Sequence, residues 1–178
     1  DVPATAPVRL LDVGTGSGAI ALAIKHERPA WEITASDIST AALQVAKANA
    51  DRLHLDVKLV YSDLLTSVSA QPFDIIVSNP PYIAASEKDV MDASVLAHEP
   101  QTALFADHDG LALYEQLATT VADHLTSTGR LYLEFGYHQG PALQTLFAQS
   151  MPDATVTLRQ DMAGHDRMLR VAMTLTRQ

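Results

Sequence analysis

The chain has 178 residues, 47% hydrophobic and 19% charged, and this composition predicts one folded domain rather than a disordered segment. Its 12 lysines and arginines against 21 aspartates and glutamates give a formal charge of −9, which argues against a broad basic surface for nucleic acid. Cysteine is absent, so disulfides, thiolate metal sites and thiol nucleophiles are excluded, and no apolar run is long enough to span a membrane. We therefore expect a cytoplasmic protein.

Strand-like and helix-like segments alternate along the chain. Apolar runs predict strands over residues 8–13, 31–37, 57–63, 73–79 and 130–136, the last entered through a turn at Thr128–Gly129. Apolar residues at helical spacing predict helices over residues 19–28, 39–53, 109–125 and 142–149. The final stretch, 154–175, predicts two antiparallel strands joined around Gly164, and the irregular segment 83–108 is expected to be a long loop.

This alternation predicts an α/β fold, in which parallel strands form a sheet and helices cover both of its faces. Ligands of such sheets bind outside the carboxyl ends of the strands. The residues that follow each strand are therefore the candidates for a functional site.

A glycine-rich loop follows the first predicted strand, and its candidate ligand residues are Asp12, Gly14, Thr15, Gly16, Ser17 and Gly18. Glycines permit a tight turn and let a ligand approach backbone amides at a helix N-terminus. The spacing of Gly14, Gly16 and Ala19 nearly meets the dinucleotide fingerprint and leaves a nicotinamide cofactor open. Asp12 would repel a pyrophosphate but attract an ammonium group, which favours S-adenosylmethionine; a solvated strand-end acid is the alternative.

Acidic residues also follow the second and third predicted strands. Asp37 can accept hydrogen bonds from both hydroxyls of a ribose, and its alternative role is to cap the next helix. Asp63 can bind the exocyclic amine of adenine while Leu64 packs on the flat face of the base. Because such a pair is common at strand ends, it carries little weight alone.

The most specific signal is the sequence Asn79-Pro80-Pro81-Tyr82 at the end of the fourth predicted strand. An amide nitrogen is a poor nucleophile, so a site that methylates one must hold its hydrogens and aim its lone pair. The carbonyls of the Asn79 side chain and of Pro80 offer two acceptors, and the prolines fix their geometry. The ring of Tyr82 can lie against a planar amide or base. The alternative is a Pro-Pro turn that only closes a strand.

The segments "LDVGTGSGAIALA", "SDI", "SD", "IIVSNPPYI", "HEPQTALFADHDGL" and "LYLEFG", in this order, resemble the HemK-type protein-(glutamine-N5) methyltransferases from Leu10 onward. Asn-Pro-Pro-Tyr alone is shared with methyltransferases that act on adenine in DNA and on ribosomal RNA. The stretch from Glu99 to Leu104, with Asp109 to Leu111, narrows the resemblance to the glutamine enzymes. The family often has Gly-Gly where Asp107 and His108 stand, which we interpret as loop variation.

The resemblance implies a Rossmann-like, class I S-adenosylmethionine-dependent methyltransferase fold with a mostly parallel seven-stranded sheet and a C-terminal antiparallel hairpin. It implies methyl transfer to the side-chain amide of the glutamine in the Gly-Gly-Gln motif of peptide chain release factors. By position, Gly14 to Gly18 and Asp37 would line the donor, with Leu64 near its adenine. Asn79 to Tyr82 would hold the glutamine, and Asn79 would also face the donor. No metal, membrane or stable nucleic-acid partner is expected.

We expect residues 1–178 to form one methyltransferase domain. The chain begins without Met and reaches a predicted strand at residue 8, which is typical of a domain boundary, and the helical N-terminal docking domain of the family is expected to be absent. Three other hypotheses stay open. Methylation of an exocyclic amine of adenine or guanine in nucleic acid would need a basic face or a flipped-base channel. A nicotinamide-dependent oxidoreductase, and a non-catalytic binding relic, would each leave Asn79 without a role.

Overall fold

The computed structural model describes residues 7–80, 83–84, 105–106 and 110–174. The first half contains β1 (Arg9–Val13), α1 (Ala19–Glu27), β2 (Glu32–Asp37), α2 (Thr40–Leu53), β3 (Lys58–Tyr61) and β4 (Phe73–Ser78). The short strands β5 (Ile83–Ala84) and β6 (Phe105–Ala106) pair with each other in parallel. The second half contains α5 (Ala112–Thr120), the 3₁₀ helix η3 (Val121–His124), β7 (Leu125–Glu134), α6 (Gly140–Ser150), β8 (Ala154–Gln160) and β9 (Asp166–Met173). None of the helices in this described part of the chain has both the length and the hydrophobicity that a bilayer crossing requires.

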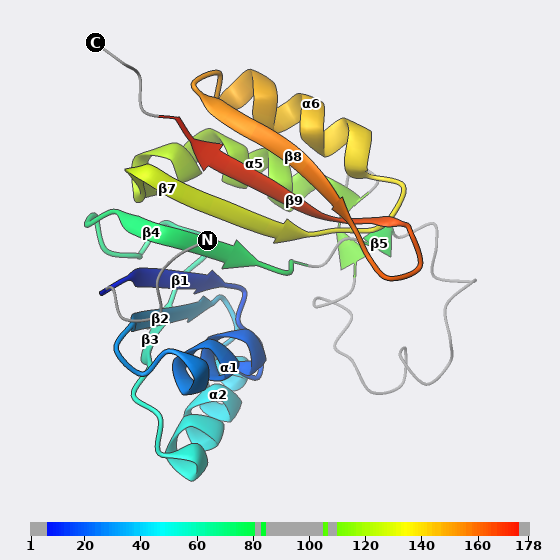
Figure 1. Ribbon diagram of the computed structural model, residues 1–178. Coiled ribbons are helices and arrows are strands. Elements are labelled where there is room, and N and C mark those ends of the chain that lie inside the picture. The colour runs from blue at the N-terminus through cyan, green and yellow to red at the C-terminus, as the bar shows by residue number, and fades with distance from the viewer. Residues whose placement is uncertain (1–6, 81–82, 85–104, 107–109, 175–178) are drawn as a thin grey trace.

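Seven strands form one sheet in the order β3-β2-β1-β4-β7-β9-β8 (Figure 1). Neighbouring strands are parallel from β3 to β7, whereas β9 runs antiparallel to both β7 and β8. This arrangement confirms the predicted mostly parallel, seven-stranded sheet with a C-terminal hairpin. The strand order reverses at β1, which lies between β2 and β4. The carboxyl ends of these strands are therefore where an open α/β sheet binds its ligands.

Two element boundaries were predicted wrongly in the segment that contains α5 and the start of β7. A single helix was predicted over residues 109–125, but the α-helix α5 ends at Thr120 and the chain continues as the 3₁₀ helix η3. β-Branched residues, which are poor α-helix formers, cluster at this point. The predicted turn at Thr128–Gly129 lies inside β7 instead. The β4–β7 pairing shifts register between Phe73 and Ile75, and this irregularity accommodates the extra residues of β7.

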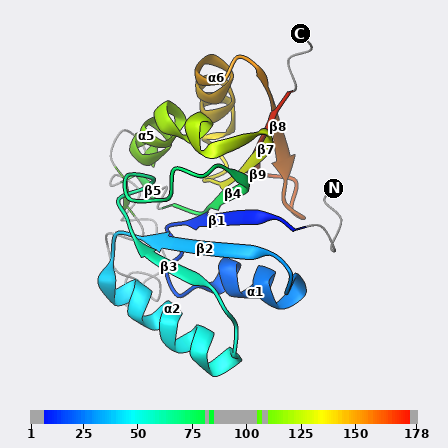
Figure 2. The same cartoon turned by 90° about the vertical axis from the view of Figure 1, so that its left-hand side faces the viewer.

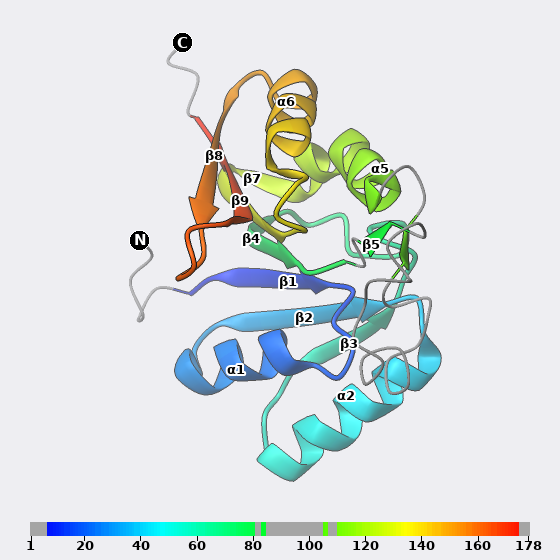
Figure 3. The same cartoon turned by 90° about the vertical axis from the view of Figure 1, so that its right-hand side faces the viewer.

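Helices cover both sides of the sheet, α1 and α2 on one side and α5 and α6 on the other (Figures 2 and 3). The α5 side holds the larger core, in which Tyr114, Phe147 and Leu131 are fully buried. A smaller core on the α1 side is built around Trp31 and Ile33. Each large apolar side chain that is fully buried stabilises the fold by about 1.5–3 kcal/mol, and the two cores together hold the strand ends in register.

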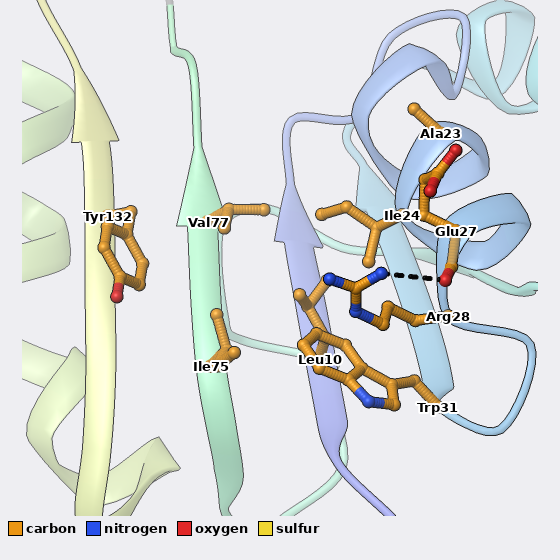
Figure 4. Close-up of a pocket in the computed structure, with 9 residues that line it drawn as sticks. All are labelled: Leu10, Ala23, Ile24, Glu27, Arg28, Trp31, Ile75, Val77 and Tyr132. Carbon is orange, nitrogen blue, oxygen red and sulfur yellow. Dashed lines mark hydrogen bonds between the residues drawn. The ribbon is translucent and has the colours of Figure 1, made fainter. Parts of the chain in front are cut away.

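An apolar groove of about 500 Å³ lies over the α1 side of the sheet (Figure 4). It is lined by Leu10, Ala23, Ile24, Glu27, Arg28, Trp31, Ile75, Val77 and Tyr132. None of these is a predicted site residue, and the groove lies against the face of the sheet rather than at the carboxyl ends of its strands. The groove is therefore not the candidate functional site.

Candidate active site

Three of the predicted site segments begin at the same level of the sheet. In the strand register Val13 is paired with Ser36 of β2 and with Ser78 of β4. Gly14, Asp37 and Asn79 each come directly after a residue of this row. The fold therefore brings the glycine loop, the acid after β2 and the Asn-Pro sequence to one edge, although the sequence separates them widely.

The glycine loop turns sharply between β1 and α1. The backbone N–H groups of Gly14 and Thr15 both donate to the Ser36 carbonyl at 2.9 Å, which fixes the loop to β2. Gly16 has a φ of +57°, and a Cβ built on it would meet nothing within 4 Å, so its backbone faces open space that a ligand can approach. Gly18 differs, because a Cβ there would lie 3.2 Å from the Ala46 side chain of α2. This contact gives Gly18 a packing role between α1 and α2.

Asp12 is a buried carboxylate with one free oxygen. It is 1% exposed, and its Oδ2 accepts hydrogen bonds from the Thr15 hydroxyl at 2.6 Å and from the Ala21 N–H at 3.2 Å. Its Oδ1 is buried without a partner. Burial raises the pKa of Asp12 to about 6, because desolvation outweighs the hydrogen bonds from Thr15 and Ala21, and the Asp37 charge adds to the rise. The unpaired oxygen fits the prediction that this acid meets a cationic group.

Asp37 connects the glycine loop to α2. Its Oδ2 accepts from the Gly16 N–H at 2.8 Å and its Oδ1 accepts from the Ser39 N–H at 2.8 Å. The side chain that caps α2 belongs to Ser39, whose Oγ accepts from the Ala42 N–H. Asp37 therefore supports the start of the helix without being its cap residue. Because each carboxylate oxygen can accept more than one hydrogen bond, the half-exposed Asp37 keeps acceptor capacity for a ribose.

Asp63 and Leu64 follow β3 at the same edge, since the Ser62 N–H donates to the Asp37 carbonyl at 3.0 Å. Asp63 is exposed, whereas Leu64 is half-buried and packs against the larger core. Leu64 has a φ of +46°, a left-handed conformation that is costly for a side chain of its size. Such strain concentrates at functional sites, which agrees with the predicted position of Leu64 near a ligand.

The backbone is held in place where the Asn-Pro sequence follows β4. The buried Ser78 hydroxyl donates to the Val13 carbonyl at 2.8 Å, so the ends of β4 and β1 are tied together. Asn79 is exposed and Pro80 is buried, which leaves the amide side chain accessible on a fixed backbone. Pro81 and Tyr82 lie outside the described residues, so their predicted contacts with an acceptor stay predictions.

Two residues at this edge were missed by the sequence reasoning. Ile38 follows Asp37 and is 58% exposed, an unusual exposure for a large apolar residue beside a candidate ligand site. Its signal in the sequence was an apolar residue directly after a strand-end acid. Ser78 gave only a weak signal, a small hydroxyl residue at the end of an apolar strand. Within the described part of the chain, no group of three or more His, Asp or Glu side chains could hold a metal ion.

The strand order and the glycine loop at the reversal point define a Rossmann-like domain of the kind found in methyltransferases. The chain belongs to the methyltransferase small domain family, whose profile matches residues 2–110. It is 46% identical over 164 residues to the release factor glutamine methyltransferase of Lactococcus lactis, covering 92% of this chain and 60% of that protein. It is 46% identical over 162 residues to that of Streptococcus pneumoniae, covering 91% of this chain and 58% of that protein. The chain thus spans about 60% of the length of these curated relatives.

Solved structures give the same picture of the fold. A methyltransferase from Pyrococcus furiosus superposes with a TM-score of 0.72 at 18% identity, covering 94% of this chain and 75% of that one. A protein-(glutamine-N5) methyltransferase from Alicyclobacillus acidocaldarius, described as release factor-specific, superposes with a TM-score of 0.56 at 28% identity. That match covers 94% of this chain and 82% of the other chain. At 18% identity the first likeness shows the fold alone.

Proposed function

We propose that this chain is the catalytic domain of a protein-glutamine methyltransferase. It transfers a methyl group from S-adenosylmethionine to the side-chain amide nitrogen of a glutamine, namely that of the Gly-Gly-Gln motif in peptide chain release factors. The observation that carries the proposal is the 46% identity to a release factor glutamine methyltransferase over 92% of the chain. The common level of Gly14, Asp37 and Asn79 at one sheet edge supports it.

The proposed donor site uses groups that the fold leaves without a full set of partners. S-adenosylmethionine supplies a methyl group on a positively charged sulfur, and it also carries an ammonium group, a carboxylate and an adenosine. The unpaired Asp12 Oδ1 suits the ammonium group, and the open backbone of Gly16 suits close approach of the ligand. Asp37 suits the ribose hydroxyls, and the exposed Ile38 next to it suits the apolar face of adenine. Asp63, after β3, remains the proposed partner of the exocyclic amine of adenine, and Leu64 remains proposed to pack on the flat face of the base.

The proposed acceptor site orients a glutamine amide rather than deprotonating it. The side-chain carbonyl of Asn79 and the backbone carbonyl of Pro80 accept hydrogen bonds from the amide NH2, so its lone pair points toward the donor. Positive charge develops on the nitrogen as the new bond forms, and two fixed carbonyl dipoles stabilise that charge. The nitrogen forms its bond to the methyl carbon as the carbon–sulfur bond of the donor breaks, and S-adenosylhomocysteine is the product that leaves. No strong base is needed, because the nitrogen gives its proton to water only after it has gained the methyl group. Pro81 and Tyr82 complete the proposed site from outside the described residues.

Methylation of an amine in nucleic acid is less well supported. The fold is also shared with a 16S rRNA guanine methyltransferase from Thermus thermophilus, but at 17% identity that likeness concerns the fold alone. The chain carries a formal charge of −9, which is unfavourable for phosphate binding.

A labelling experiment tests the proposal. The protein is incubated with S-adenosylmethionine labelled in its methyl group and with one of three acceptors: a release factor, the same factor with alanine in place of the Gly-Gly-Gln glutamine, or duplex DNA with ribosomal RNA. We expect label in the intact factor only. Label in nucleic acid, or equal label in the two factors, would reject the proposed acceptor.

A further inference from the structure

An exposed apolar and aromatic patch lies beside the candidate active site and has no role in the chemistry proposed above. Its rings are those of Tyr137 and His138, in the loop between β7 and α6, and of His165, in the turn between β8 and β9. The exposed Met162 lies in the same turn as His165, and we call these four residues the hairpin patch. Met162 is 108% exposed and Tyr137 is 50% exposed. The Tyr137 ring lies 3.7 Å from the His138 ring and 5.3 Å from the His165 ring, centroid to centroid. The patch therefore joins two segments that are distant in the sequence.

The backbone that carries the hairpin patch is held firmly. Asp161 Oδ1 accepts hydrogen bonds from the N–H groups of Ala163 and His165, at 2.9 and 3.0 Å. The Arg167 guanidinium donates to the Phe135 carbonyl at 3.2 Å, and its Nε lies 3.6 Å from Asp161 Oδ2. Hydrogen bonds therefore stabilise the β8–β9 turn internally and also join it to the loop after β7. Exposed side chains on an ordered backbone bind a partner at a lower entropic cost than those on a mobile loop.

The patch lies at the edge of the sheet that carries the proposed catalytic residues. Figure 1 shows the ends of β4 and β7 and the turn between β8 and β9 at one edge. Ser78 is paired with Leu133, so Asn79 is level with Glu134, and Tyr137 follows Glu134 by three residues in the loop after β7. The chain from Glu134 to Tyr137 can therefore extend at most about 10 Å beyond the end of β7. A protein that presents a glutamine to Asn79 would therefore also contact the patch. The contact would be made by residues a few positions from that glutamine, or by an adjacent surface of the same protein.

We propose that the hairpin patch is a docking surface for the acceptor protein, contacting apolar side chains next to the methylated glutamine. This inference rests on the proposed function, because it assumes a protein acceptor at Asn79. Tyrosine and methionine are enriched at protein interfaces, and an exposed apolar group beside an active site is typical of a recognition surface. Neither Met162 nor Tyr137 is buried in a core, so stability of the fold does not account for their exposure.

Alanine variants test the proposal with a release factor as acceptor. We expect the double variant Tyr137→Ala/Met162→Ala to raise the KM for the release factor about tenfold or more, the usual effect of losing interface anchors. The kcat, the Kd for S-adenosylmethionine and the melting temperature should stay unchanged. Leu53→Ala is the matched control, because Leu53 is a similarly exposed apolar residue at the far end of α2 from the catalytic edge. Met162→Glu, which keeps the exposure but adds a charge, should also raise the KM.

A short peptide containing Gly-Gly-Gln separates docking from chemistry. Because such a peptide, cut to these three residues and blocked at both ends, offers the patch no apolar side chain, its KM should be the same for the wild type and the double variant. A wild-type KM for the release factor in the double variant, or a fall in kcat with both acceptors, would overturn the docking role while leaving the proposed function intact. If the wild-type protein methylates neither acceptor, the proposed function itself fails.

Discussion

The Ser78 hydroxyl donates a hydrogen bond of 2.8 Å to the Val13 carbonyl, and both residues are buried. This bond joins β4 to β1 at the level where both strands end. Gly14 of the glycine loop follows Val13, and Asn79 follows Ser78. A single side chain therefore helps set the distance between the proposed donor site and the proposed acceptor site.

Replacing Ser78 with alanine should affect both stability and catalysis. Loss of the buried hydrogen bond should lower the free energy of unfolding by about 1 kcal/mol, measured by urea denaturation. Because the start of the Asn-Pro sequence is then less well fixed, kcat should fall more than the affinity for S-adenosylmethionine. Ser127→Ala, at an exposed position of β7, is the control. A variant with reduced stability but wild-type kcat would show that Ser78 does not position Asn79.

The raised pKa of Asp12 predicts how stability changes with pH. With a pKa of about 6 in the folded state against 3.8 as the ordinary value, the folded protein binds more protons than the unfolded chain between these values. The contribution of Asp12 therefore makes the free energy of unfolding fall as pH rises through this window. Relative to wild type, Asp12→Asn should gain roughly 2 kcal/mol in unfolding free energy between pH 4 and pH 7.5. A constant difference across that range would contradict the raised pKa.

The same variant should bind S-adenosylmethionine less well. A neutral amide cannot pair with the ammonium group of the donor, so we expect the Kd at pH 7.5 to rise about tenfold or more. In the wild type the affinity should fall below pH 6, where Asp12 becomes protonated. Calorimetric titration across pH measures both effects. Equal affinity at pH 5 and pH 7.5 would mean that Asp12 stays uncharged or does not meet the donor.

Asp37→Ala should also weaken donor binding. The variant loses the proposed ribose acceptor and the hydrogen bond that Asp37 accepts from the Gly16 N–H, so the Kd should rise roughly tenfold or more. Ser39→Ala, which removes the cap of α2 but leaves Asp37 in place, separates the two roles. If both variants lose stability alike and neither changes the Kd, Asp37 serves only the start of α2.

Asn79→Ala should abolish methyl transfer while the protein stays folded. Asn79 is exposed, so the free energy of unfolding should change by less than about 0.5 kcal/mol. Donor affinity should fall only modestly, because most of the proposed donor contacts come from β1 and β2. Single-turnover assays with labelled donor measure the transfer step directly. Turnover at the wild-type rate would remove Asn79 from the proposed mechanism.

The sequence predicted the fold well where local signals agree with tertiary structure. Apolar runs and turn residues located the strands of the sheet, and the helix predicted over residues 39–53 agrees with α2, for which Ser39 is the N-cap. The prediction failed around Thr128–Gly129, because a glycine that signals a turn in the sequence instead lies within β7 where its pairing with β4 is irregular. Such an irregularity depends on the partner strand and leaves no local signal.

The candidate site was predictable as a set of strand ends but not as a set of contacts. The glycine loop, Asp37 and Asn79 were identified because each follows a strand. The unpaired oxygen of Asp12, the bond from Asp37 to the Gly16 N–H and the tie between Ser78 and Val13 all depend on the strand order. A sequence does not give that order directly, since β1 is paired both with β2, the next strand, and with β4, which comes three strands later along the chain.

Methylation of the acceptor can be observed by mass spectrometry of a release factor after incubation with this protein and S-adenosylmethionine. We expect a gain of one methyl group, which fragmentation assigns to the side-chain amide of the Gly-Gly-Gln glutamine, and no gain with the Asn79→Ala variant. A methyl group on another residue, or an unchanged factor in the presence of protein that binds the donor, would contradict the proposed function.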